Sequence, residues 1–101
     1  MKNFNEIKTI DINVLEWFDK QAGNTYFAAT VTINYYMENE DTFVIPFKCG
    51  YGVHAINVAI KEIQKRYEGT PSYTSEIKES GVVMRTNRRD ALKRELINLA
   101  K

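Results

Sequence analysis

The strongest constraint on the fold is a run of strict alternation over residues 25–37, TYFAATVTINYYM. One set of alternate positions holds Phe27, Ala29, Val31, Ile33 and Tyr35, and the other holds Ala28, Thr30, Thr32, Asn34 and Tyr36. The first set is more apolar than the second. Because successive side chains of a strand point to opposite faces, this run predicts a strand with one buried face.

A second strand is predicted before it, in residues 7–18, IKTIDINVLEWF. Ile10, Ile12 and Val14 share one parity, but the apolar role then passes to Leu15 and Trp17. A β-bulge at Val14–Leu15 would return all of these side chains to a single buried face. Gly23 and Asn24 predict the turn that joins the two strands, since both residues tolerate positive φ.

A third strand is predicted after the polar turn ENED, in residues 42–48, TFVIPFK. Phe43, Ile45 and Phe47 alternate and are expected to point inward. Pro46 has no N–H, so this strand is expected at a sheet edge or with Pro46 at a non-pairing position.

The second half of the chain predicts helices. Residues 53–67 carry apolar side chains at three- and four-residue spacing, and Gly69 and Pro71 end the run. Residues 70–80 fit either a loop or a short strand, and the run VVMRT at 82–86 fits a fourth strand. Asn87 is placed to cap a final helix, whose buried stripe would be Leu92, Leu96 and Leu99.

Together these elements predict one α+β domain over residues 1–101. We expect a three-stranded antiparallel meander, with a short fourth strand left open, and two helices packed on one face of the sheet, in the order β-β-β-α-(β)-α.

Composition narrows the classes of function. The net charge is +1 and there is one cysteine, Cys49, so a strong general attraction to nucleic acid and an internal disulfide are both excluded. No signal peptide and no membrane span are apparent in the sequence. We therefore expect a soluble cytoplasmic protein without a membrane partner.

The stretch WFDKQAGNTYFAATVTI, followed by IPFKCGYG and a helix, resembles a family of small phage and prophage proteins. The matching positions are Trp17, Phe18, Asp19, Gly23, Asn24, Thr25, Tyr26, Phe47, Gly50, Tyr51 and Gly52. The resemblance covers roughly residues 10–66 and implies a phage accessory gene rather than a reaction. Independently of the family, Trp17 and Tyr26 are expected to pair across the hairpin, and Asp19 to accept hydrogen bonds from its loop.

Charge is concentrated near the end of the chain. Residues 84–101 contain six basic and two acidic side chains. A partner-binding basic patch is predicted at Arg85, Arg88, Arg89, Lys93 and Arg94. Arg88 and Arg89 would fall in the first turn of the predicted helix, where the dipole disfavours cations and an anionic partner would compensate. Lys61, Lys65 and Arg66 would extend the patch if the two helices were neighbours. The alternative is an ordinary solvated helix face.

Aromatic side chains supply a second set of candidates for partner binding: Trp17, Tyr26, Tyr36 and Tyr51. An enzyme is a weaker hypothesis. Cys49 and His54 lie five positions apart before a helix, but no third orienting group accompanies them. The segment GYG lacks the rest of a phosphate-binding fingerprint. No catalytic residue, metal site or cofactor is predicted.

The sequence thus favours a phage-encoded accessory binding protein, an anti-CRISPR-like stoichiometric inhibitor of a host or defence-system protein or nucleoprotein. The alternative is a nucleic-acid-binding accessory protein of phage replication or transcription. A homodimer through an edge strand is also open.

Overall fold

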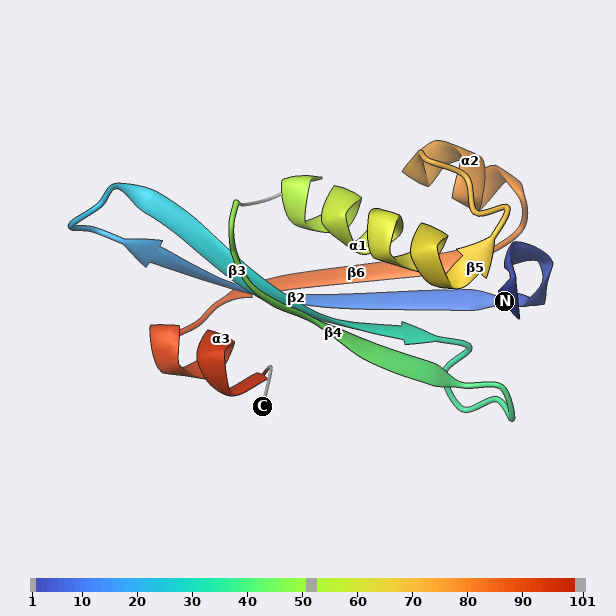
Figure 1. The fold of residues 1–101 in the computed structure, drawn as a ribbon, viewed down its shortest axis with the longest axis horizontal. Coiled ribbons are helices and arrows are strands. Elements are labelled where there is room, and N and C mark those ends of the chain that lie inside the picture. The colour runs from blue at the N-terminus through green and yellow to red at the C-terminus, as the bar shows by residue number, and fades with distance from the viewer. Residues whose placement is uncertain (1, 51–52, 100–101) are drawn as a thin grey trace.

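The computed structural model describes residues 2–50 and 53–99, and its main feature is a four-stranded sheet in the order β4-β3-β2-β6 (Figure 1). The strands are β2 (Thr9–Asp19), β3 (Asn24–Ile33), β4 (Asp41–Cys49) and β6 (Val83–Asp90). β2, β3 and β4 form the predicted antiparallel meander, and β6 adds to β2 in the parallel direction. The α+β class is confirmed, and the fourth strand is longer than the sequence run suggested.

Three α-helices accompany this sheet: α1 (Val53–Arg66), α2 (Thr74–Glu79) and α3 (Lys93–Leu99). A short 3-10 helix, η1 (Phe4–Glu6), and a two-stranded parallel pair, β1 (Lys2–Asn3) with β5 (Tyr67–Glu68), complete the chain. None of these described helices has the length and apolar character needed to span a bilayer. Residues 70–80, for which the sequence allowed either a loop or a short strand, contain α2.

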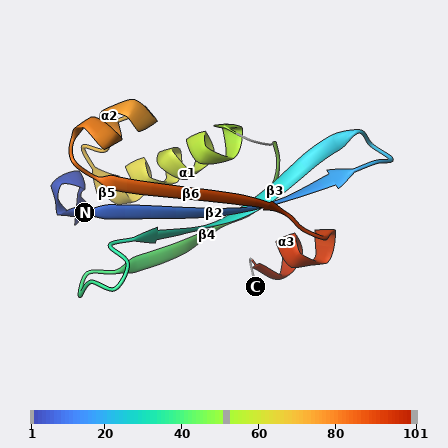
Figure 2. The same ribbon diagram turned by 180° about the vertical axis from the view of Figure 1, so that it is seen from behind.

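The helices lie on both faces of the sheet, and not on one face as predicted. Figure 1 and the reverse view in Figure 2 place α1 and α2 on one side and α3 on the other. We name the two sides by their helices. The α1 face carries Ile10, Ile12 and Val14 of β2, which are buried in the main core with Ala59 and Ile63 of α1. The α3 face carries the side chains of opposite parity.

The helix α3 on the second face of the sheet explains why the apolar residues of β2 change parity without a bulge. The register of β2 runs unbroken from Ile10↔Ile33 to Asp19↔Asn24, so the predicted bulge at Val14–Leu15 was wrong. Leu15 and Trp17 instead turn to the α3 face, where the fully buried Leu96 of α3 packs. One strand therefore has apolar residues on different faces along its length because a helix covers each face.

The bulge occurs in β4, at Pro46. Ala29 pairs with Ile45 and Phe27 pairs with Lys48, so β4 has one residue more than β3 over this interval. As predicted, Pro46 lies on an edge strand. Phe43 and Ile45 are buried on the α1 face, but the extra residue reverses the parity that follows and sends Phe47 to the α3 face. The prediction that Phe47 points into the main core was wrong for this reason.

The end of β3 is held by a buried asparagine. Asn34 has a φ of 56° and its side-chain oxygen accepts the N–H groups of Lys8 (2.6 Å) and Thr9 (3.3 Å). Its amide donates to the Glu6 carbonyl at 3.0 Å. The side chain therefore ties the entry to β2 to the exit from β3 and satisfies three backbone groups.

Candidate binding surface

The outer edge of β6 is one of the two edges of the four-stranded sheet. Val83 donates its N–H to the Lys8 carbonyl at 3.1 Å, and Ala91 donates to the Glu16 carbonyl at 2.8 Å. In a parallel ladder, alternate residues of a strand form the hydrogen bonds with the neighbouring strand. Residues 85, 87 and 89, which lie between Val83 and Ala91, therefore also direct their backbone groups towards β2. The backbone N–H and C=O groups that turn outward are those of Met84, Thr86, Arg88 and Asp90.

The side chains of β6 divide between the two faces. The register pairs Val14 with Arg88 and Leu15 with Arg89, so Arg88 lies on the α1 side and Arg89 on the α3 side. Arg85 shares the α3 side with Arg89. The prediction that Arg88 and Arg89 begin a helix was wrong, because these residues are strand and α3 begins only at Lys93. Their charge therefore borders a sheet edge and not a helix N-terminus.

Arg85 is already paired within the chain. Its Nε and one terminal nitrogen donate to the two carboxylate oxygens of Asp11, at 2.6 and 2.9 Å. These hydrogen bonds and the charge of Asp11 raise the pKa of Arg85. Because both oxygens are engaged in a bidentate contact, Arg85 offers less to a partner than a free guanidinium would.

Arg89 is held more loosely, by Glu95 of α3. Its two terminal nitrogens lie 3.5 and 3.4 Å from one oxygen of that carboxylate. The other oxygen accepts the Leu92 N–H at 2.8 Å, which caps the first turn of α3. The Leu92 hydrogen bond is the main cause that lowers the pKa of Glu95, and Arg89 adds to it. Glu95 therefore mainly stabilises the first turn of α3, and its contact with Arg89 is weaker.

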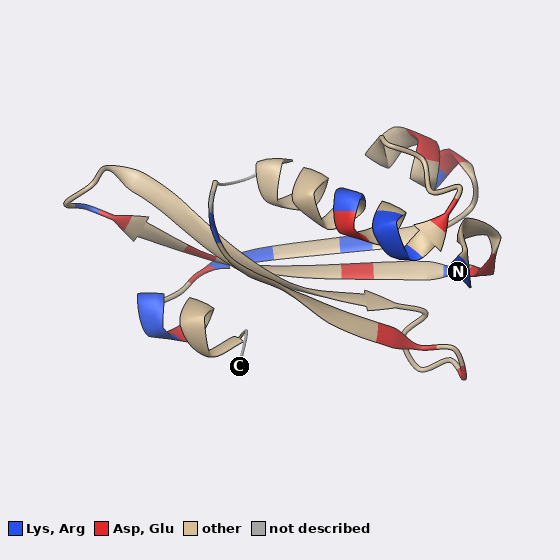
Figure 3. Ribbon diagram, in the orientation of Figure 1, with Lys and Arg blue, Asp and Glu red and all other residues tan. Residues whose placement is uncertain are grey.

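The remaining predicted cations lie apart from one another. The ammonium of Lys93 lies 5.4 Å from the centre of the Trp17 ring, in a cation–π contact. Arg88 and Arg94 are exposed, and within the described residues neither has an ion pair. Figure 3 shows that Lys and Arg residues occur on both β6 and α3. In the predicted patch, Arg85 and Arg89 therefore have carboxylate partners and Lys93 has an aromatic contact, whereas Arg88 and Arg94 have no ion pair among the described residues.

The basic side chains of α1 do not extend this patch towards α3, since the two helices cover opposite faces. Lys65 and Arg66 both reach Glu62, at 3.5 and 3.8 Å. The Arg66 guanidinium also lies over the Phe43 ring at 4.1 Å. The proposed extension through Lys61, Lys65 and Arg66 depended on the two helices being neighbours, and they are not.

Three aromatic rings form a row across β2, β3 and β4 on the α3 face. Trp17 stacks with Tyr26 at a centroid distance of 5.7 Å, as predicted from the hairpin, and Tyr26 stacks with Phe47 at 5.0 Å. The sequence did not indicate Phe47 as part of this row, because nothing in the run TFVIPFK reveals a bulge except Pro46 itself. The rings face each other, and Lys93 lies over Trp17.

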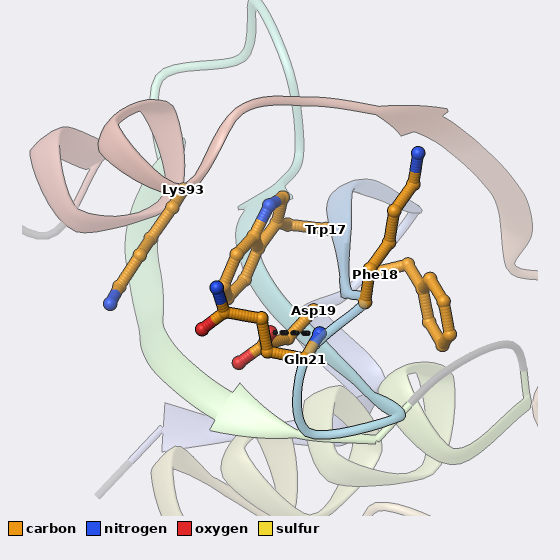
Figure 4. A pocket seen from close by; sticks show the side chains of 6 residues that line it. Trp17, Phe18, Asp19, Gln21 and Lys93 are labelled. Atoms are coloured by element: carbon orange, nitrogen blue, oxygen red, sulfur yellow. Dashed lines mark hydrogen bonds between the residues drawn. The ribbon is translucent and has the colours of Figure 1, made fainter.

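A hollow of about 490 Å³ lies beside this row, at the β2–β3 hairpin. Figure 4 shows Trp17, Asp19, Gln21 and Lys93 around it. The Asp19 carboxylate accepts the N–H groups of Gln21 (3.0 Å) and Ala22 (3.3 Å), as predicted for this loop. Both N–H groups reach the same carboxylate oxygen, so one oxygen of Asp19 stabilises the turn. Trp17, Phe18 and three polar side chains complete the lining of the hollow.

The other aromatic candidates are not part of the row. Tyr36 is 86% exposed and follows the opposite end of β3, where its ring lies 4.3 Å from that of Tyr35. It has a φ of 63°, and its N–H donates to the Glu40 carboxylate at 2.7 Å. Tyr51 lies outside the described residues. The structure therefore brings Trp17 and Tyr26 together and separates Tyr36 from them.

The weaker Cys–His hypothesis gains no support from the described atoms. His54 is exposed in the first turn of α1, and its ring meets the edge of Phe27 at 6.1 Å. The side chain of Cys49 lies outside the description. Gly50 has a φ of 144°, and a Cβ there would overlap the His54 ring. Among the described residues, no group of three His, Cys, Asp or Glu side chains is placed to hold a metal ion.

Comparison with protein-family models, with curated proteins and with solved structures found no match to this chain.

Proposed function

We propose that this chain is a small binding protein that acts by docking on another macromolecule, with β6 and the start of α3 as the contact surface. The observation that carries the proposal is the edge of β6, where four residues present outward backbone groups beside the exposed side chain of Arg88. An exposed edge combined with arginine is a common basis for protein recognition.

The resemblance to phage proteins supports a more specific version. In that version the protein is an anti-CRISPR-like stoichiometric inhibitor, which occludes a host or defence factor in the cytoplasm of the infected cell. Arg88 and Arg94 would pair with acidic groups of the target, and the Trp17–Tyr26 row would supply apolar contact area near Lys93. No chemistry on the target is required for inhibition by occlusion.

A second candidate is a nucleic-acid-binding accessory protein of phage replication or transcription. The two exposed arginines without an ion pair in the described structure, Arg88 and Arg94, favour it, since either could contact a phosphate. The pairing of Arg85 with Asp11 and the contact of Lys93 with Trp17 leave fewer cations for such a role. Affinity that falls steeply with salt would be its signature.

The test is a tagged pull-down from a bacterial lysate, with and without nuclease and at low and high salt. The bait proteins are the wild type, an Arg88→Ala/Arg94→Ala variant and a control variant, Lys48→Ala/Lys61→Ala, which removes the same charge from exposed residues of β4 and α1. We expect one protein partner in near-equal amount, resistant to nuclease, retained by the control and reduced about tenfold or more by the arginine variant.

Two other results would count against the proposal. Recovery of nucleic acid, with loss of every partner after nuclease, would favour the second candidate. Equal capture of a partner by the wild type and by the arginine variant would show that this surface is not the contact.

A further inference from the structure

The outer edge of β6 is straight and without interruption, which distinguishes it from the other edge of the same sheet. Its register with β2 runs without a shift from Thr9↔Val83 to Glu16↔Asp90, and residues 83–90 contain neither proline nor glycine. In contrast, β4 carries Pro46 and a bulge, two devices that prevent strands from adding to an edge. The sheet therefore protects its β4 edge by backbone geometry and leaves the β6 edge open.

The charge on β6 indicates what kind of strand could add there. A strand placed beside β6 would present one residue next to Arg88 on the α1 side and the following residue next to Arg89 on the α3 side. Arg88 has no ion pair among the described residues, and Arg89 has only the long contact with Glu95. Two consecutive acidic residues in the incoming strand would meet both guanidinium groups.

A second copy of this chain fits the edge poorly in the register that uses all of its outward backbone groups. One antiparallel register of two β6 strands uses the outward groups of Met84, Thr86, Arg88 and Asp90. In it, Met84 of one copy pairs with Asp90 of the other, and Thr86 pairs with Arg88. That register places Arg85 of each copy opposite Arg89 of the other, so like charges meet twice on the α3 side. Directly opposed like charges are destabilising in a sheet, so this register is disfavoured for a second copy.

From these three observations we propose that β6 receives an extended acidic segment of a partner protein as a fifth strand of the sheet. The outward backbone groups of residues 84, 86, 88 and 90 supply the affinity, and Arg88 and Arg89 select consecutive carboxylates. This inference rests on the proposed binding function and names the class of partner for the same surface.

The test uses amide hydrogen exchange of the whole chain, followed by NMR, with two synthetic eight-residue peptides as probes. Both have a Thr/Val background; one carries Glu-Glu at its centre and the other Lys-Lys. In the free protein we expect fast exchange at the amides of residues 84, 86, 88 and 90 and protection at 85, 87 and 89. The Glu-Glu peptide should slow exchange of the four outward amides about tenfold or more, and the Lys-Lys peptide should not.

Charge reversal makes the test independent of folding damage. Arg88→Glu should weaken binding of the Glu-Glu peptide about tenfold or more and improve binding of the Lys-Lys peptide. Lys48→Glu is the matched control, because it makes the same change at an exposed residue on the opposite edge of the sheet. It should leave both peptides unaffected, and the unfolding temperatures of the two variants should remain close to that of the wild type.

The failure of this inference can be separated from the failure of the proposed function. If a partner captured in the pull-down leaves the four outward amides exchanging as in the free protein, strand addition is wrong and docking stands. Binding of both peptides with equal affinity, or no added protection by the Glu-Glu peptide, would also overturn the inference. If no partner is captured and neither peptide binds, both the proposed function and this inference are wrong.

Discussion

The two faces of the four-stranded sheet are built differently, although the same strands contribute to both. The α1 face has the more continuous apolar surface, and its β2 residues Ile10, Ile12 and Val14 are almost inaccessible to solvent. The α3 face is apolar only near the hairpin, where Leu15 and Trp17 lie. Beyond α3 it becomes polar, with the Asp11–Arg85 pair exposed at its surface.

The difference shows which part of the sheet folds the chain and which part remains available for binding. A fourteen-residue helix covers the α1 face and buries most of the core, whereas a seven-residue helix covers only part of the α3 face. We therefore expect folding to depend mainly on the α1 face, and the exposed residues of the α3 face and of β6 to be available for contact with a partner.

Adjacent residues of β3 give the largest expected contrast between the faces. Phe27 is fully buried on the α1 face and Tyr26 is half-buried on the α3 face. Phe27→Ala should lower the free energy of unfolding by about 3–5 kcal/mol, since it leaves a cavity in the main core. Tyr26→Ala should cost about 1–2 kcal/mol, because it removes two stacking contacts from a partly exposed row.

Chemical denaturation of the two variants measures this contrast, with the exposed Tyr73→Ala as a control that should change stability little. An equal loss from Phe27→Ala and Tyr26→Ala would show that the α3 face contributes as much to folding as the α1 face.

The contrast also explains which elements could be predicted from sequence. The meander and α1 were predictable because each buries one face over most of its length and so shows a period of two or of about four. The end of the chain was predicted only in part: a short strand at 82–86 and a helix from near Asn87 were expected, whereas β6 continues to Asp90 and α3 begins at Lys93. In β6 only Met84 is half-buried and the other residues are exposed, so the strand has no apolar alternation to reveal it. Its stability comes from pairing with β2, which a local pattern does not show.

The sequence indicated several residues of the candidate surface but not how they are arranged. The arginine-rich composition of residues 84–101 indicated a basic patch, and the hairpin indicated the Trp17–Tyr26 pair. The sequence did not show that Asp11 would neutralise Arg85, a partner 74 positions away. Nor did it show that a single bulge would add Phe47 to the aromatic row, because parity after a bulge depends on pairing between strands.

Loss of the main apolar contact of α3 should destabilise the α3 face and leave the α1 face stable. Leu96 is fully buried, and Leu96→Ala should cost about 2 kcal/mol, at the low end for such a change, because a short terminal helix can detach and limit the loss. Amide exchange should then quicken in α3 while α1 stays protected. Ile97→Ala, at an exposed position of the same helix, is the control. Simultaneous loss of protection in α1 and α3 would mean that the two faces form one cooperative unit.

The last prediction concerns a polar group at the margin of the main core, whose effect is seen only at high pH. Tyr67 is 2% exposed, and its hydroxyl donates to the Asp41 carboxylate at 3.1 Å. Burial and this hydrogen bond raise the pKa of Tyr67 to about 12. An unfolded chain loses the phenol proton near pH 10, so between pH 10 and 12 the unfolded state binds fewer protons than the folded one.

Stability from this group is therefore complete below about pH 10 and is lost as the pH rises towards 12. Thermal unfolding at a series of pH values should show a steeper decline for the wild type than for Tyr67→Phe, which has no phenol proton to lose. Tyr73→Phe removes an exposed hydroxyl instead and should retain the wild-type decline. If Tyr67→Phe and the wild type lose stability in parallel over this range, the raised pKa is not coupled to folding, and the margin of the α1 face is wetter than its packing indicates.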